Sequence, residues 1–314
     1  MAISGLCKVR IWRGEGMIAS LDLVESFKQF LERTGKKEAT IQSYRRDLTQ
    51  FFEFLTECHM PLASVDQKTL NHYKLFLQAK NDGGKPNSFR RAVIAIRLFY
   101  RHLPQFSSLN LSPLDDVPIP MRDERSPRKL RASEVDQLFQ SCGQSKFSLK
   151  ASRDKVILCL LCFEGLKVSE LIHLDWKHFL SASSKGSLNV PGERKRLIFL
   201  NSQTHEAILE YQKTLLEYES ELPRARKMIL GFKGRESLSI APRISRHGLK
   251  FMLYEIGEEC RIPKLNTEIL RHHAIQFHLD RGESVESVME HFGLRRIGNI
   301  AKHFRAKKTD EPKV

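Results

Sequence analysis

The sequence predicts a mainly α-helical protein with one small β-hairpin, organised as two domains. Apolar residues recur at helical spacing through most of the chain, in four segments before residue 104 and again after residue 131. Between them, four prolines lie among charged residues at positions 109–130, where no periodicity is visible, as in a linker. We therefore expect a loose leader at 1–16, a helical domain at 17–108, a linker at 109–130, a second domain at 131–304 and a disordered tail at 305–314.

The net charge and the apolar content of the sequence restrict the classes of partner that the protein can have. The 314 residues include 52 Lys and Arg against 37 Asp and Glu, which gives a net charge of +15 and a pI near 9.6. Such a surplus favours a polyanionic partner, most commonly nucleic acid. No apolar run approaches the roughly 20 residues that span a bilayer, and no signal-peptide core is visible. We expect a cytoplasmic protein that binds no membrane and no small-molecule substrate.

The six cysteines are scattered and predict no metal site. Cys159 and Cys162 have the spacing of a redox or zinc pair, but they lie within an apolar helical segment that has no second ligand pair nearby. We interpret them as reduced thiols in the core, and we expect no metal and no cofactor.

Arginines gather on two helices expected in the first domain. One follows residues 86–88 and carries an arginine stripe with no acidic residue interleaved, so nothing on that helix neutralises it. On a helix beginning at Thr40, two more arginines lie off the apolar face. A solvated surface is the ordinary explanation of such a stripe, but its lack of acids favours phosphate contact. The predicted contacts are Arg45, Arg46, Arg90, Arg91, Arg97 and Arg101.

In the second domain the pattern predicts a helix-rich fold around one hairpin. Short strands at 187–190 and 194–200 are joined by a Pro-Gly-Glu turn at 191–193. The expected helices span residues 132–142, 152–163, 203–222, 244–260, 267–279, 285–292 and 296–304.

The segment 266–273 has the features of an anion site. Asn266 or Thr267 is suited to cap a helix, and Arg271 and His272 follow within its first turns. A guanidinium, an imidazole and the positive end of a helix dipole would together favour a bound anion. Taken alone, the segment is better explained as a solvated charge cluster.

The order of several motifs resembles the tyrosine recombinase (integrase) family, in particular its Xer-type members. The resemblance extends from about residue 21 to residue 304. In the first domain it rests on TIQSYRRDL at 40–48 and on the helix at 88–100. In the second it rests on Arg153-Asp154, GLKVSEL at 165–171, the hairpin ending at 195–198, EILRH at 268–272 and FGL at 292–294.

This resemblance implies a two-domain DNA clamp, with a core-binding (SAM-like) DNA-binding domain and a catalytic-type domain closing around a duplex. Active members of the family cleave one strand through a tyrosine that becomes covalently linked to the phosphate, without metal or nucleotide. Their arginines, lysine and histidines neutralise the charge that gathers on the phosphate. The implied partner is double-stranded DNA, together with further copies of the protein or another recombinase assembled on it.

Several family positions are substituted here. Lys167 stands in place of the first arginine, and a lysine lacks the planar fork that holds two phosphate oxygens. Pro191 occupies the apparent position of the hairpin lysine, for which Lys195 or its arginine neighbours would have to substitute. At the remaining positions, Glu268 and Leu294 replace residues that donate hydrogen bonds. The nucleophile position falls at or beside His303, and no tyrosine follows Tyr254.

These departures predict a DNA-binding protein without strand-cleavage activity. Glu268 lies three residues before Arg271, where it could pair with the guanidinium, and it would repel a phosphate about 5 Å away by roughly 3 kcal/mol at an effective dielectric constant near 20. Two alternatives remain open: an active recombinase that uses His303, and a regulatory partner of an active recombinase. The polar tail lacks the apolar residues of a helix that docks into a neighbouring subunit. We expect a nucleoid-associated protein whose second domain contacts DNA through Lys167, Lys195, Arg196, Arg243, Arg246, Arg271 and His272.

Overall fold

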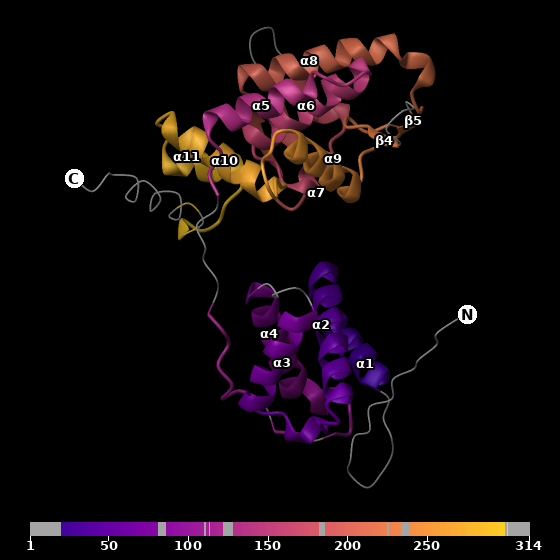
Figure 1. Ribbon diagram of the computed structural model, residues 1–314, viewed down its shortest axis with the longest axis vertical. Helices are drawn as coiled ribbons and strands as arrows, with labels where there is room; N and C mark the ends of the chain where they lie inside the picture. The colour runs from indigo at the N-terminus through magenta and orange to yellow at the C-terminus, as the bar shows by residue number, and fades with distance from the viewer. Residues whose placement is uncertain are drawn as a thin grey trace, which may run out of the picture. The chain divides into compact units, whose positions relative to one another are not determined.

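The computed structural model describes residues 20–80, 86–109, 111–112, 114–121, 128–181, 186–224, 226–233, 239–298 and 300. The predicted leader at 1–16, the nucleophile candidate His303 and the predicted tail at 305–314 lie outside these residues. Figure 1 shows the chain, which separates into two compact units, Met1–Arg125 and Ser126–Val314. Among the described residues, no helix is long and apolar enough to cross a membrane.

The first unit is a helical bundle. Its helices are α1 (Ser20–Arg33), α2 (Glu38–Glu57), α3 (Gln67–Lys80) and α4 (Pro86–His102), with 3₁₀ turns at Leu62–Ser64 and Leu103–Gln105. Helix α2 packs against the other three, because its apolar face is rich in large side chains. Phe51, Tyr73 and Phe99 are fully buried there and pack edge to face with neighbouring rings.

Part of the predicted linker belongs to this core. Leu114 and Val117 are buried against the helices of the first unit. The chain is held there by Arg97, which donates hydrogen bonds to the carbonyl oxygens of Asp115 at 2.8 Å and Val117 at 2.9 Å. The proline-rich composition therefore did not reveal that this segment is packed.

The arginine stripe of α4 is compensated by carboxylates from other parts of the chain. Arg91 donates to both oxygens of Asp47 on α2, at 2.6 and 2.8 Å. Arg101 forms an ion pair with Asp115. No acid of α4 itself neutralises the stripe, as the sequence indicated, but tertiary packing brings in acids that a pattern along one helix does not include.

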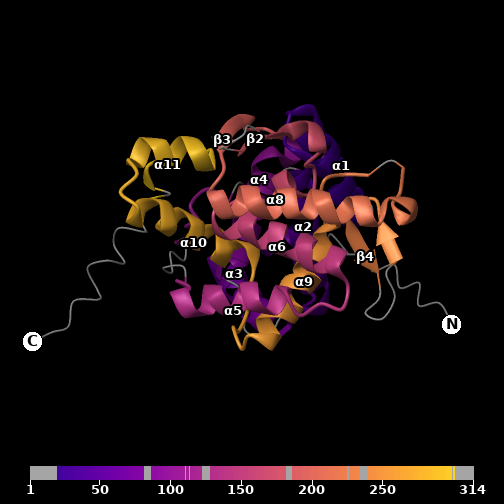
Figure 2. The same cartoon turned by 90° about the horizontal axis from the view of Figure 1, so that it is seen from above.

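The second unit is built around α6 (Ser148–Cys162). Figures 1 and 2 show α6 between α5 (Ala132–Cys142) and α8 (Ser202–Glu217), and it also packs against α10 (Thr267–Asp280). Its apolar residues are buried on all sides, as expected for a central helix. Cys159 and Cys162 are free thiols in this core, and burial raises the pKa of Cys159 to about 12.

Two small antiparallel sheets accompany the helices. The predicted hairpin is present as β2 (Gly186–Val190) and β3 (Arg196–Phe199), with Val190 opposite Arg196. Strand β1 (Phe179–Ser181) adds a third strand beside β2, and β4 (Gly231–Lys233) pairs with β5 (Ser239–Ala241). These last three strands were not predicted, because three residues are too short to show a period of two.

The remaining elements of the second unit position the residues of the candidate site. They are α7 (Val168–Leu171), α9 (Arg246–Glu259), α11 (Val285–Phe292) and 3₁₀ turns at Trp176–His178 and Glu219–Glu221. Helix α11 packs against both α10 and β3, so its C-terminal end lies beside the hairpin. Most of the helix predicted at 296–304 falls outside the described residues.

Candidate functional site

The site forms where the ends of two helices meet. Helix α6 gives way to Gly165 and α11 ends at Gly293, and both glycines have left-handed backbones with φ of 56° and 60°. A Cβ on Gly165 would lie only 2.2 Å from Cε1 of Phe292. Glycine is therefore required at Gly165 both by conformation and by close approach. The turns leave backbone carbonyl oxygens pointing out of the helix ends.

Arg271 joins these two ends. It lies in α10, whose start is fixed by the Asn266 side chain, which accepts hydrogen bonds from the N–H groups of Glu268 and Ile269. The buried guanidinium of Arg271 donates to the carbonyl oxygen of Gly165 and, at 2.7 Å, to that of Phe292. The main chain therefore fixes the orientation of the guanidinium.

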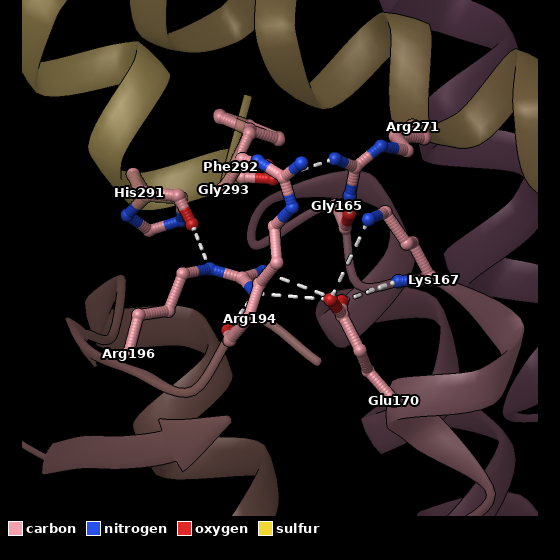
Figure 3. A network of polar contacts seen from close by, with 9 residues as sticks. All are labelled: Gly165, Lys167, Glu170, Arg194, Arg196, Arg271, His291, Phe292 and Gly293. Carbon is pink, nitrogen blue, oxygen red and sulfur yellow. Dashed lines mark hydrogen bonds and ion pairs between the residues drawn. The ribbon is translucent and has the colours of Figure 1, made fainter. Parts of the chain in front are cut away.

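Two arginines of the hairpin bind the same end of α11. Arg196 Nε donates to the carbonyl oxygen of His291 at 2.5 Å, and Arg194 Nη1 donates to that of Gly293 at 2.7 Å. With Arg271, three successive carbonyls of α11 each accept from a different arginine, as Figure 3 shows. The C-terminal end of a helix carries partial negative charge, which stabilises cations there.

Glu170 is the carboxylate at the centre of the cluster. It is buried on α7 and accepts from the Lys167 backbone N–H at 2.9 Å and from Arg196 at 3.0 and 3.3 Å. Its second cationic neighbour is Lys167 Nζ, at 4.0 Å. Burial favours the neutral acid, but the hydrogen bonds from Arg196 and Lys167 outweigh it, so the pKa of Glu170 is lowered. Glu170 is thus a fixed anion inside a cationic site.

Lys167 occupies the accessible side of the cluster. Its side chain is 43% exposed. Partial burial lowers the pKa of Lys167, and the charges of Arg271, Arg194 and Arg196 lower it further, although Glu170 acts in the opposite direction. A lysine whose proton is destabilised by neighbouring cations lies in a positive potential, which an added anion would relieve.

The other predicted positions of the second domain are arranged differently. Glu268 is exposed and acts on Arg271 through the field of its charge, whereas the expected ion pair is replaced by the backbone contacts of Arg271. Leu294 is half-buried and packs against the small apolar cluster that contains Val288 and Phe292. His272 is half-buried one residue after Arg271.

The remaining predicted phosphate contacts are mostly on the surface. Lys195 is exposed in the hairpin turn, Arg246 is exposed at the start of α9, and Arg243 is exposed in the segment that precedes this helix. In the first unit Arg45 and Arg46 are exposed on α2, and Arg90 on α4 is half-buried. For these residues, contact with DNA phosphates remains a prediction.

Sequence reasoning assigned no role to Glu170, and it considered Arg194 only as one possible substitute for the hairpin lysine. Both have a signal in the sequence, since Glu170 stands at the N3 position of a short helix and Arg194 borders the hairpin. Their partners could not be predicted. Every residue type has a main-chain carbonyl, so the sequence does not reveal which carbonyls at the end of α11 accept hydrogen bonds.

Comparison with known proteins agrees with this architecture. Residues 24–105 match the family described as phage integrase, N-terminal SAM-like domain. The chain is 28% identical over 288 residues to the tyrosine recombinase XerD of Halalkalibacterium halodurans, covering 90% of this chain and 91% of the relative. The chain is similar to tyrosine recombinases of the Xer type over most of its length. A second relative, the XerC of Chlorobaculum tepidum, is 28% identical over 308 residues and covers 88% of each chain.

Solved structures of tyrosine recombinases share the fold. A XerH recombinase bound to a palindromic difH substrate superposes with a TM-score of 0.67 at 15% identity, covering 86% of this chain and 78% of that one. A lambda integrase dimer bound to a COC′ core site gives a TM-score of 0.64 at 13% identity, covering 94% and 79%. The predicted Xer-type resemblance and the mainly α-helical fold class are confirmed.

Proposed function

We propose that this tyrosine recombinase relative binds duplex DNA at the cationic site and does not cleave it. The observation that carries the proposal is the convergence of Lys167, Arg194, Arg196 and Arg271 around one buried carboxylate, Glu170 (Figure 3). These cations exceed the charge that Glu170 can balance. A phosphate is the anion best suited to such a set of guanidinium and ammonium groups.

Duplex DNA is the source of phosphate that the whole chain favours. The net charge of +15 supports binding to a polyanion rather than to a single small anion. The solved relatives that share the fold are described as bound to their DNA substrates. In this proposal the exposed arginines of α2 and α9 add sequence-independent phosphate contacts, and the protein is cytoplasmic and nucleoid-associated.

The proposed lack of cleavage rests on the residues that replace catalytic groups. Leu294 packs in an apolar cluster and has no hydrogen bond to offer a phosphate. Lys167 supplies charge without a guanidinium fork. Glu268 places negative charge at the start of α10, where the phosphate would accumulate charge during cleavage. In the printed sequence no tyrosine follows Tyr254.

DNA binding is tested by fluorescence anisotropy with a labelled duplex at several salt concentrations. The logarithm of the binding constant should fall linearly with the logarithm of salt concentration. Lys167→Gln and Lys195→Gln should each weaken binding to all sequences alike and reduce the salt slope by about 1. Lys213→Gln, which removes the same charge from an exposed position on α8, is the matched control. Absence of binding at low salt, or equal losses in all three variants, would contradict the proposed site.

Cleavage is tested separately with nicked suicide duplexes that trap a covalent protein–DNA adduct. We expect no adduct on denaturing gels under salt conditions where anisotropy shows binding. An adduct that disappears in His303→Ala would establish an active recombinase with a relocated nucleophile, and an adduct that persists would place the nucleophile elsewhere. Either adduct would refute the non-cleaving assignment while leaving DNA binding intact.

A further inference from the structure

A second group of polar side chains consists of Glu164, His278 and His291. Glu164 follows α6, His278 lies in α10 and His291 lies in the last turn of α11. Their potential ligand atoms all fall within 4.8 Å of one another. Glu164 is fully buried, and the side chains of His278 and His291 are only 10% and 11% exposed. A carboxylate removed from water in this way requires a positive partner.

Two atoms of the group are buried without a hydrogen bond. Among the described residues, neither Glu164 Oε2 nor His291 Nε2 has a hydrogen-bond partner. The two atoms are 3.4 Å apart and face each other. In a tetrahedral zinc site with bonds of about 2.0–2.2 Å, ligand atoms are separated by roughly 3.3–3.6 Å. The observed separation fits two ligands on one ion, and it also fits a direct ion pair between the carboxylate and a protonated imidazole.

The far sides of two of these residues are anchored by hydrogen bonds. Glu164 Oε1 accepts from the backbone N–H of Asn201 at 3.0 Å, which leaves Oε2 directed into the group. His278 Nδ1 lies 2.7 Å from Glu283 Oε1. A carboxylate bound to the distal nitrogen is the common way to fix the tautomer and orientation of a metal-binding histidine.

His278 Nε2 also has a contact that metal binding would replace. It lies 2.9 Å from the carbonyl oxygen of Phe163. A neutral imidazole has one N–H and cannot donate to both Phe163 and Glu283. If Nδ1–H of a neutral ring donates to Glu283, the lone pair of Nε2 faces a carbonyl oxygen, which is unfavourable unless a second ring proton or a metal ion lies beside them.

We propose that Glu164, His278 and His291 form a binding site for a divalent transition-metal ion, best suited to Zn²⁺. Two imidazoles and one carboxylate are a ligand set that zinc accepts, with water in the fourth position. The ion ties the end of α6 to α10 and α11. It thereby fixes the backbone of His291 and Phe292, whose carbonyl oxygens bind Arg196 and Arg271. The role is structural and independent of whether the chain binds DNA.

The experiment uses the full chain, with any histidine tag removed, after dialysis against a chelator. Zinc is added in defined amounts, and bound metal is counted by mass spectrometry after gel filtration. Titration calorimetry supplies the affinity, and Co²⁺ substitution supplies visible absorption bands characteristic of tetrahedral coordination. We expect one equivalent of zinc and a rise in melting temperature that increases with zinc concentration.

Isosteric variants localise the ion. Glu164→Gln keeps the acceptor for Asn201 and should weaken zinc binding at least tenfold, and Glu283→Gln should weaken it about tenfold to a hundredfold through His278. His247→Gln, at an exposed position on α9, is the matched control and should bind as the unmodified chain does. Circular dichroism of each variant without metal shows whether it is folded.

Three outcomes would overturn the proposal. The first is no zinc retained by the folded chain, which would leave Glu164 and His291 as a buried pair that shares a proton. The second is one equivalent still bound with unchanged affinity in Glu164→Gln, which would place the metal elsewhere, for instance on cysteines. The third is an equal loss of affinity in His247→Gln.

Discussion

Removal of the charge of Glu170 should destabilise the second unit more than any other single neutralisation at the site. In Glu170→Gln the amide keeps one acceptor oxygen, but its NH₂ group would face the donors of Arg196. Arg196 now sits 3.0 and 3.3 Å from the carboxylate, and its side chain is 7% exposed, so water cannot replace the lost partner. Breaking a buried ion pair in this way costs about 3–5 kcal/mol of unfolding free energy. For a domain of 150–250 residues this corresponds to a fall of roughly 6–20 °C in melting temperature.

The pH dependence supplies a second measurement. Because the folded-state pKa of Glu170 is lowered from 4.5, the carboxylate contributes stability that is present above that unfolded-state value and is lost as the pH falls through the folded-state pKa. The difference in unfolding free energy between the unmodified chain and Glu170→Gln should therefore be constant near pH 7 and shrink below about pH 4. Urea titrations followed by circular dichroism measure it at each pH.

Glu268→Gln is the matched control, since it removes the same charge from an exposed residue near the same arginines. Its unfolding free energy should remain within about 0.5 kcal/mol of the unmodified value. Two results would refute the reasoning about Glu170: a loss below about 1 kcal/mol at pH 7, or a loss of the same size in both variants.

Three other changes test neighbouring parts of the structure. Gly165→Ala should prevent stable folding in thermal melts, because φ is 56° and a Cβ would overlap Phe292, whereas Gly192→Ala, with φ of 111° and open space, should cost only about 1–3 kcal/mol. In anisotropy titrations, Glu268→Gln should tighten DNA binding by about fivefold to 150-fold, because it removes repulsion of about 1–3 kcal/mol, and unchanged affinity would remove Glu268 from the site. Asp115→Asn should steepen the salt dependence of DNA binding by releasing arginines of α4 for phosphate, and an unchanged slope would show that those arginines do not reach DNA.

The helices could be predicted from the sequence because their burial is one-sided and periodic. Helices α5 and α11 begin and end at the predicted residues, since each has a clear apolar face. For α6 the predicted start was late, because its first two turns, from Ser148, are mixed in polarity and the continuous apolar run begins only at Val156. The β1, β4 and β5 strands depend on pairing with distant segments rather than on their own composition.

The site was predicted only in part. Arg271 was identified from its position near a helix start, but its partners were expected to be side chains and are backbone carbonyls. The Glu164–His278–His291 group was not anticipated at all. Its two histidines lie on consecutive helices, but Glu164 is more than 100 residues away in the sequence, and local motif spacing carries no information about such a set.

The compensated arginines change how DNA binding by the first unit should be understood. An ion pair with an internal carboxylate does not prevent a guanidinium from binding phosphate, but each such contact then requires exchange of one anion for another. The net free energy gained by this exchange is therefore smaller for Arg91 than for Arg101. The partner of Arg91, Asp47, is 6% exposed and accepts two hydrogen bonds from it, whereas the partner of Arg101, Asp115, is 47% exposed. Arg91 accordingly stabilises the packing of α4 on α2, and Arg101 is the arginine of α4 better placed to exchange its carboxylate for a phosphate. The burial of the paired acids thus separates the arginines of this stripe into those with a structural role and those for which phosphate contact remains a prediction.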